Sequence, residues 1–281
     1  MDSTRHALSP GPQVRPPFAW GMLCIVAGLL IGMTGCARYR PALLINYSQE
    51  GARISVDRIC PGASPHWSPD GTHLVFEDGG GIWIMAPEEK EPHQVIQAGS
   101  HPRWSPNGNT IAYDHQGIRI WDRGSNAHSL ISPEGTHPCW SPDGRSLVFR
   151  NQGIWLMSID GSSGEKLLNE GTPLAFSPDG ATILVELWEP QLVLFTLALL
   201  NRATGELTPI GPGTKGSFAP DGYSVIYSHG GIRIYSLVKR DSIVFALDGY
   251  DPEWSPDGTR IAFCARGYVW LIDAPYRAIR E

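Results

Sequence analysis

The sequence predicts an all-β protein, a six-bladed β-propeller with four-stranded antiparallel blades. Three observations predict this fold: a motif of the form Trp-Ser-Pro-Asp-Gly occurs six times, its copies are almost evenly spaced, and short β-rich segments follow each copy. The lead aromatic residues are Trp67, Trp104, Trp140, Phe176, Phe218 and Trp254. The intervals between them are 37, 36, 36, 42 and 36 residues, and a period of this size is typical of repeat architectures.

The first element of each repeat is a turn that its own residues define. Ser suits the first position of a type I turn, Pro presets φ at the second, and Asp follows. Gly accepts the left-handed conformation that ends the turn. Because this pattern links two antiparallel strands through a glycine bulge, each motif predicts the corner between the first two strands of a blade.

Three further strands follow each turn. The second strands are predicted at 74–77, 111–114, 147–150, 225–228 and 261–264. The third strands follow a tight glycine turn, at 82–85, 118–121, 154–157, 232–235 and 268–271. Weaker fourth strands are predicted at 93–97, 128–132, 165–169 and 243–247. Strands this short, separated by Gly and Pro, argue against helices, and six such sheets bury their faces when each packs on its neighbours in a ring.

The sixth repeat supplies only three strands, from Trp254 to Asp273. The tail at 274–281 is too short and too charged to add a fourth. Residues 53–59, RISVDRI, are β-rich and stand where the fourth strand of a preceding blade would stand. We therefore expect this N-terminal strand to complete the last blade, which closes the ring non-covalently and removes open sheet edges.

The unit Pro-x-Trp-Ser-Pro-Asp-Gly, followed by an Ile-Ala-Phe-like strand and an Ile-Trp-like strand, resembles the TolB-like propeller repeat, also described as WD-like. The resemblance covers residues 53–273. A WD-repeat propeller fits less well, because the Gly-His start is absent and a Trp-Asp strand ending occurs once, at Trp121 and Asp122. TolB has an additional α/β domain before its propeller, for which this sequence leaves no room. The resemblance implies an exported, non-enzymatic binding module.

The N-terminal residues 1–35 predict a lipoprotein signal peptide. Basic residues precede an apolar run at 18–35, which ends in small residues, as export signals do. The ending Met-Thr-Gly-Cys resembles the bacterial lipobox, which implies that Cys36 carries the lipid and anchors the chain to a membrane. The alternative is a transmembrane anchor, because the run is close to the lower length limit for a span.

The remaining boundaries follow from this interpretation. Residues 36–52 form a linker, 53–273 the propeller and 274–281 a C-terminal tail. Ala37, rather than Asp, follows the cysteine. In a cell with two membranes, this residue predicts an outer-membrane protein that faces the periplasm.

Composition excludes one class of partner. The chain has 22 basic and 28 acidic side chains, and 20 and 27 of these lie outside residues 1–35. An acidic balance without a basic stripe argues against nucleic acid. Of the cysteines outside the signal, Cys139 beside Trp140 is expected to be a buried thiol. A bridge between Cys60 and Cys264 is an open alternative, although an odd number of cysteines does not describe a disulfide framework.

Motifs for catalysis are absent from the sequence. It contains no Gly-x-Ser-x-Gly elbow, no His-Glu-x-x-His and no phosphate-binding loop. We therefore predict no catalytic residue and no cofactor.

The start of the innermost strands offers a candidate ligand site at the channel mouth. The residues three positions before the lead aromatics are Ser64, His101, His137, Pro173, Lys215 and Asp251, and a shift of one would bring Thr172 into this ring. Two imidazoles and a carboxylate, from His101, His137 and Asp251, suit zinc or a similar metal. The alternative is a hydrated polar rim that holds no metal.

The fourth repeat departs from the others. It is 42 residues long, and its segment 183–201 is strongly apolar with a Glu-Pro-Gln turn at 189–191. We expect a hairpin that extends beyond the ring and exposes a partner surface at Trp188, Leu192 and Leu194. The alternative is that the longer strands pack only on blades three and five.

The sequence thus predicts a lipid-anchored envelope propeller that binds a protein or peptide. The alternative function is a propeller with an axial metal or glycan site, as in a lyase or a sensor.

Overall fold

The computed structural model describes residues 56–89 and 91–274, which belong to one compact unit, Arg40–Glu281. The predicted signal peptide, the linker with Cys36 and all but the first residue of the predicted tail lie outside the described residues. Within the described part, no helix is long and apolar enough to cross a membrane.

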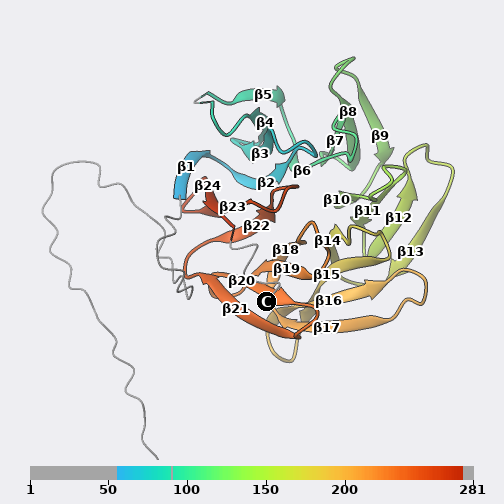
Figure 1. Cartoon of the computed structure of the whole chain (residues 1–281). Coiled ribbons are helices and arrows are strands. Elements are labelled where there is room, and N and C mark those ends of the chain that lie inside the picture. The colour runs from blue at the N-terminus through green and yellow to red at the C-terminus, as the bar shows by residue number, and fades with distance from the viewer. Residues whose placement is uncertain (1–55, 90, 275–281) are drawn as a thin grey trace, which may run out of the picture. The chain divides into compact units, whose positions relative to one another are not determined.

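The described chain forms six four-stranded antiparallel sheets, as predicted (Figure 1). Blade 1 consists of β2 (Ala63–Trp67), β3 (Leu74–Asp78), β4 (Gly81–Met85) and β5 (His93–Ile96). Blade 2 consists of β6 (Ser100–Trp104), β7 (Thr110–Asp114), β8 (Ile118–Asp122) and β9 (His128–Ser132). Blade 3 consists of β10 (Thr136–Trp140), β11 (Ser146–Arg150), β12 (Ile154–Ser158) and β13 (Gly164–Leu168). Blade 4 consists of β14 (Thr172–Phe176), β15 (Thr182–Glu189), β16 (Leu194–Asn201) and β17 (Leu207–Pro212). Blade 5 consists of β18 (Thr214–Phe218), β19 (Ser224–Ser228), β20 (Ile232–Ser236) and β21 (Asp241–Ala246). Blade 6 consists of β22 (Tyr250–Trp254), β23 (Arg260–Ala265), β24 (Tyr268–Asp273) and β1 (Val56–Pro61).

The first strand of each blade lies innermost, and each inner strand contacts the inner strands of both neighbouring blades, from β2 through β22 and back to β2 (Figure 1). The apolar core lies between blades. Val75 and Ile82 of blade 1, for example, pack in one cluster with Trp104 and Ile111 of blade 2. The lead aromatic residue therefore recurs because it fills the contact between adjacent sheets.

The N-terminal strand closes the ring, as the sequence predicts. β1 pairs antiparallel with β24, and Cys60 lies opposite Val269. The described strand, Val56–Pro61, extends to Pro61, beyond the predicted end at 59, and residues 53–55 of the predicted strand lie outside the described residues. Cys60 and Cys264 are both buried free thiols, so the alternative of a bridge between them is wrong. The Cys60 and Cys264 side chains pack in the apolar core and form no disulfide.

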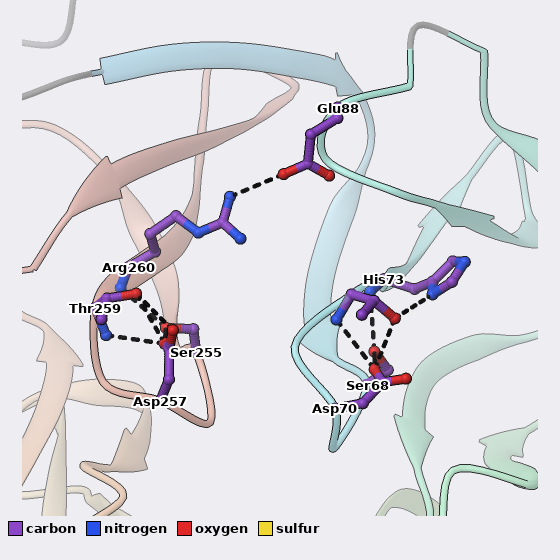
Figure 2. Close-up of polar contacts among 9 residues, drawn as sticks. Ser68, Asp70, His73, Glu88, Ser255, Asp257, Thr259 and Arg260 are labelled. Atoms are coloured by element: carbon purple, nitrogen blue, oxygen red, sulfur yellow. Dashed lines mark hydrogen bonds and ion pairs between the residues drawn. The ribbon is translucent and has the colours of Figure 1, made fainter.

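The repeated motif forms the turn that its residues predict (Figure 2). The Gly71 N–H donates to the Ser68 carbonyl at 2.9 Å, and φ of Gly71 is 71°. The Ser68 hydroxyl donates to Asp70 at 2.5 Å, and the same carboxylate accepts the Thr72 N–H at 3.0 Å. Hydrogen bonds of the same kind hold the turn at Ser255, so Ser, Asp and Gly are each fixed by a bond or a dihedral angle.

The motif also joins neighbouring blades. A Cβ atom added to Gly108 would lie 3.3 Å from the Pro69 ring, and one added to Gly144 would lie 3.7 Å from Pro106. The proline of one turn therefore rests against the glycine of the next. At the ring closure Arg260 of blade 6 approaches Glu88 of blade 1 at 3.5 Å (Figure 2). This exposed ion pair stabilises the fold by at most about 1 kcal/mol.

Inner strands begin with a bulge that the preceding blade caps. Five non-glycine residues there have φ between 50° and 56°: Ser64, His101, His137, Lys215 and Asp251. The N–H of His101 donates to Glu77 at 2.9 Å, and that of Lys215 donates to Glu186 at 3.1 Å. We call this contact the inter-blade cap. It leaves the extra residue of the bulge with a satisfied N–H.

One blade junction lacks the inter-blade cap for a reason visible on both sides. Pro173 of blade 4 has no N–H to donate. The residue of blade 3 that corresponds to Glu77 is Arg150, which has no acceptor. The two exceptions coincide, so neither leaves a polar group unsatisfied.

Candidate functional site

The ring surrounds a channel with two chemically different ends. We call the end where the inner strands begin the strand-start mouth, and the end at the Ser-Pro-Asp-Gly turns the turn mouth. A pocket of about 450 Å³ lies at the strand-start mouth, over blades 3, 4 and 5. A cavity of about 340 Å³ lies at the turn mouth and is lined by all six blades. Both volumes fall in the range of small-ligand sites.

The strand-start pocket combines positive and aromatic side chains. Arg150 and Lys215 line it together with Trp188 and Phe195. In the described part of the chain, neither Arg150 nor Lys215 forms an ion pair. The Glu186 carboxylate in the wall accepts the Thr214 hydroxyl and the Lys215 N–H. Glu170 is a second, exposed carboxylate in the lining. The pocket thus offers an anionic group two cationic side chains, Arg150 and Lys215, beside two glutamates.

Two of the predicted mouth residues contact each other. The rings of His101 and His137 stack with centroids 3.7 Å apart, and His101 Nδ1 lies 2.8 Å from Asp114. Burial, and next the charge of His101, lower the pKa of His137 to about 2, so its ring is neutral at physiological pH. Of these two, His137 lines the pocket.

The third predicted mouth residue lies elsewhere on the ring. Asp251 begins the inner strand of blade 6, where its N–H donates to Ser228 at 3.0 Å. Among the described residues, no group of three or more His, Cys, Asp or Glu side chains is placed to hold a metal ion. In blade 4, Thr172 lines the pocket. It pairs with Glu186 as Ala63 pairs with Glu77, so Pro173 holds the position of Ser64 and the predicted shift by one is wrong.

The long repeat forms an extended hairpin, with eight residues in each of β15 and β16. Its base is core, since Ile183 and Leu197 are fully buried. Its outer end is exposed: Trp188 is 46% and Leu192 65% accessible, whereas Leu194 is half-buried. The two sequence interpretations therefore describe different parts of one hairpin.

The hairpin and the channel mouth meet in one pocket, although the sequence suggested them as separate sites. Trp188 pairs across the strands with Phe195, with ring centroids 4.9 Å apart at an angle of 61°. Both rings line the pocket together with His137. The aromatic pair of Trp188 and Phe195 thus lines the same pocket as Arg150 and Lys215.

Sequence reasoning missed the residues at the turn mouth. These are the residues immediately before the lead aromatics: His66, Arg103, Cys139, Ala175, Ser217 and Glu253. Side chains alternate between the faces of a strand, so a residue next to a buried aromatic side chain faces the other way. This alternation was the available signal, because three ionisable residues at one position of an inner strand predict a polar channel wall.

His66 and Glu253 approach each other at 3.6 Å without forming an ion pair at neutral pH. Burial, followed by the charge of Arg103, lowers the pKa of His66 well below its ordinary value. Burial raises the pKa of Glu253 to about 7, against the opposing effect of Arg103. Both side chains line the cavity, with 23% and 18% of their surface accessible, yet protein surrounds them closely enough to disfavour charge.

The Cys139 thiol completes this wall. It is buried, as predicted, and donates to the Leu174 carbonyl at 3.1 Å. Burial raises its pKa, so it stays protonated and unreactive at neutral pH.

Known structures match this fold, whereas neither a protein-family model nor a curated protein sequence matches the chain. TolB from Acinetobacter baumannii shares 15% identity at a TM-score of 0.58, over 79% of this chain and 64% of that one. A putative TolB from Agrobacterium tumefaciens shares 17% identity at a TM-score of 0.58, over 78% and 96%. A gluconolactonase from Xanthomonas campestris shares 16% identity at a TM-score of 0.64, over 85% and 96%.

At these identities the likeness establishes the fold alone. The neighbours include TolB-like propellers and also propellers named as enzymes, among them an oligogalacturonate lyase from Vibrio parahaemolyticus at 12% identity and a TM-score of 0.54. The chain spans 64% of the length of the A. baumannii TolB. The chain is a six-bladed propeller whose scaffold is shared by proteins of several functions.

Proposed function

We propose that this chain is a lipid-anchored envelope propeller that acts as a non-enzymatic binding module and holds an acidic peptide segment of another envelope protein. The peptide binds at the strand-start mouth. The observation that carries the proposal is the pocket that joins Arg150 and Lys215 to the exposed aromatic pair of Trp188 and Phe195.

The chemistry of this pocket matches a peptide with acidic and apolar side chains. Arg150 and Lys215 offer charge to carboxylates, and the hairpin end offers exposed apolar surface at Trp188 and Leu192. Arginine and tryptophan dominate the binding energy of many protein interfaces. The exposed end of an otherwise buried hairpin has no role in the core, which supports a role in contact with a partner.

Binding fits the pocket better than catalysis does. A general acid or base works best when its pKa is near the ambient pH, and the pKa of His137 is about 2. His101 is held by Asp114, and Glu186 serves the inter-blade cap. The alternative of a metal-dependent lyase through His101, His137 and Asp251 has less support, because the two rings stack.

A site-specific photo-crosslinker tests this function in the full chain within its own cell envelope. Placed at Leu192, it should give one dominant crosslinked protein, because this side chain is 65% exposed on the hairpin. The matched control is the same crosslinker at Val238, which is 73% exposed on blade 5 and outside the pocket.

Substitutions then identify the chemistry. Arg150→Gln with Lys215→Gln, and separately Trp188→Ser, should each reduce the Leu192 crosslink at least fivefold. Leu130→Ser, at an exposed site on blade 2, should leave it unchanged. Equal products from positions 192 and 238, or a crosslink that persists without Arg150, Lys215 and Trp188, would exclude the proposed pocket.

The lipid anchor is tested separately at Cys36. Growth with an alkyne-bearing fatty acid should label the wild-type chain, and Cys36→Ser should abolish both the label and membrane retention. Equal labelling of the two chains would contradict diacylation at this cysteine. Membrane retention without any label would favour the transmembrane-anchor alternative.

A further inference from the structure

The turn-mouth cavity holds a cation without a carboxylate partner in contact. Arg103 is the only Lys or Arg among the residues that line it, and Glu253 is the only Asp or Glu. In the described chain Arg103 forms no ion pair within 4.0 Å; its side chain hydrogen-bonds with the Cys139 thiol, and Glu253 and Asp251 act on its charge from farther away. A guanidinium presents a fork of donors that matches a carboxylate. The cavity therefore has one strong site for an anion.

The neighbours of Arg103 do not cancel its charge at neutral pH. Glu253 is about half ionised near pH 7, because burial raises its pKa to about 7. His66 is neutral, and the Cys139 thiol is protonated. The charge of the residues that line the cavity is thus positive on balance, which favours an anionic ligand over a cationic one. Asp251, which does not line the cavity, is the other carboxylate that acts on Arg103.

His66 and Glu253 offer a second, complementary site. His66 Nδ1 accepts the Trp104 N–H at 3.2 Å, so the neutral ring carries its proton on Nε2. Nε2 lies 3.6 Å from the Glu253 carboxylate, too far for a good hydrogen bond. One donor and one acceptor therefore stand side by side without satisfying each other. A hydroxyl group can accept from the first and donate to the second.

Two further side chains that line the same cavity each carry a donor without an acceptor. The indole N–H groups of Trp67 and Trp104 are buried and have no hydrogen-bond acceptor among the described residues. Both side chains line the cavity and are only 3% exposed. A buried N–H without an acceptor costs about 1–3 kcal/mol, which a bound oxygen-rich molecule or water within reach would offset.

We propose that the turn-mouth cavity binds a small hydroxylated carboxylate of the sugar-acid type, with its carboxylate on Arg103 and a hydroxyl between His66 and Glu253. A volume of about 340 Å³ fits one such molecule and not a polymer. This site lies at the opposite end of the channel from the peptide pocket, and it shares no residue with the proposed anion-binding pair Arg150 and Lys215.

Calorimetric titration of the purified full chain in detergent tests the proposal with matched probes. D-glucuronate and D-gluconate are compared with D-glucose, which has the hydroxyls and lacks the carboxylate. At least one of the two acids should bind at pH 7 at least tenfold more tightly than glucose, and should raise the melting temperature. Arg103→Gln should weaken binding of that acid at least tenfold.

Two variants keep the test decisive. Arg145→Gln, at an exposed arginine of blade 3, should bind as the wild type does. If Arg103→Gln does not fold by circular dichroism, Arg103→Lys keeps the charge and should still weaken binding severalfold, because it loses the fork.

The proposal is overturned by any of three results. They are no binding of either acid, equal binding of glucose, or binding that persists unchanged in the Arg103 variants. None of these results would alter the crosslinking outcome at Leu192, so the two proposals fail independently.

Discussion

At the scale of single residues, burial decides which charges this propeller carries. His66 and Glu253 are close enough to form an ion pair, yet burial disfavours the charged form of each. The penalty of desolvation exceeds the attraction available between them. Arg103 remains charged in the same wall, so the turn mouth acquires a positive charge that the overall acidic composition does not suggest.

This arrangement predicts how stability depends on pH. The folded pKa of Glu253 is about 7, above the ordinary value of 4.5, so the folded state loses stability as pH rises through this window. Glu253→Gln should remove that loss. Urea unfolding should show the variant more stable than the wild type by up to about 3 kcal/mol at pH 8.5, with a smaller gap at pH 5. Glu134→Gln, at an exposed position, is the control, and a gap independent of pH would refute the shifted pKa.

Single residues also show where sequence reasoning succeeds and where it stops. The Ser68 to Gly71 turn could be predicted because its hydrogen bonds and its positive φ arise within the motif itself. Arg103 and Glu253 could not be paired in advance, because three blades of the ring separate them along the chain and only closure brings both to one cavity. The sequence predicted mouth residues three positions before each lead aromatic residue, whereas the residues that line the turn mouth lie one position before it.

At the scale of elements, neighbouring blades are joined by polar contacts as well as by apolar packing. Glu77 at the end of β3 accepts the Ser64 hydroxyl at 3.1 Å and the His101 N–H at 2.9 Å. It thereby connects the inner strands of blades 1 and 2. The missing cap at Arg150 and Pro173 shows that donor and acceptor are required together, since one without the other would leave an unsatisfied group.

The inter-blade cap predicts an asymmetry between two truncations. Glu77→Ala should cost about 1–3 kcal/mol, because it leaves the His101 N–H of a strained bulge without its acceptor. Arg150→Ala, at the junction without a cap, should change the free energy of unfolding by less than about 0.5 kcal/mol. Urea unfolding at pH 7 measures both. Equal costs would mean that the cap contributes no more than an exposed side chain does.

The extended hairpin shows how far length alone can predict an element. Six extra residues in repeat four indicated longer strands, and β15 and β16 are eight residues each. The sequence could not divide the apolar residues between core and surface, because Leu197 and Leu192 are chemically alike. Leu197 is 0% exposed and Leu192 is 65% exposed, and this difference depends on how far blades 3 and 5 extend beside them.

At the scale of the whole molecule, the ring closes by joining the two ends of the propeller. The repeat count predicted this closure, because the last repeat was one strand short and a β-rich segment preceded the first. β1 supplies that strand, with Val56 opposite Ile272 and Cys60 opposite Val269. The outer edge of β24 is thereby paired, and blade 6 is the only described blade built from both ends of the described chain.

Closure predicts that β1 stabilises the entire ring and not only its own blade. A chain that begins at residue 62 lacks β1 and should melt at least about 10 °C below a chain that begins at residue 53, because it loses the β24 pairing and the buried Cys60 side chain. Differential scanning calorimetry should show one transition in both, since blades that pack cyclically unfold together.

The open edge of β24 should also cause association, visible as oligomers in gel filtration. A synthetic peptide of residues 53–61 should restore the melting temperature and the monomer, because β1 is held only by non-covalent contacts. Equal melting of the two chains would mean that blade 6 is stable with three strands and that the ring is held by its inner strands alone.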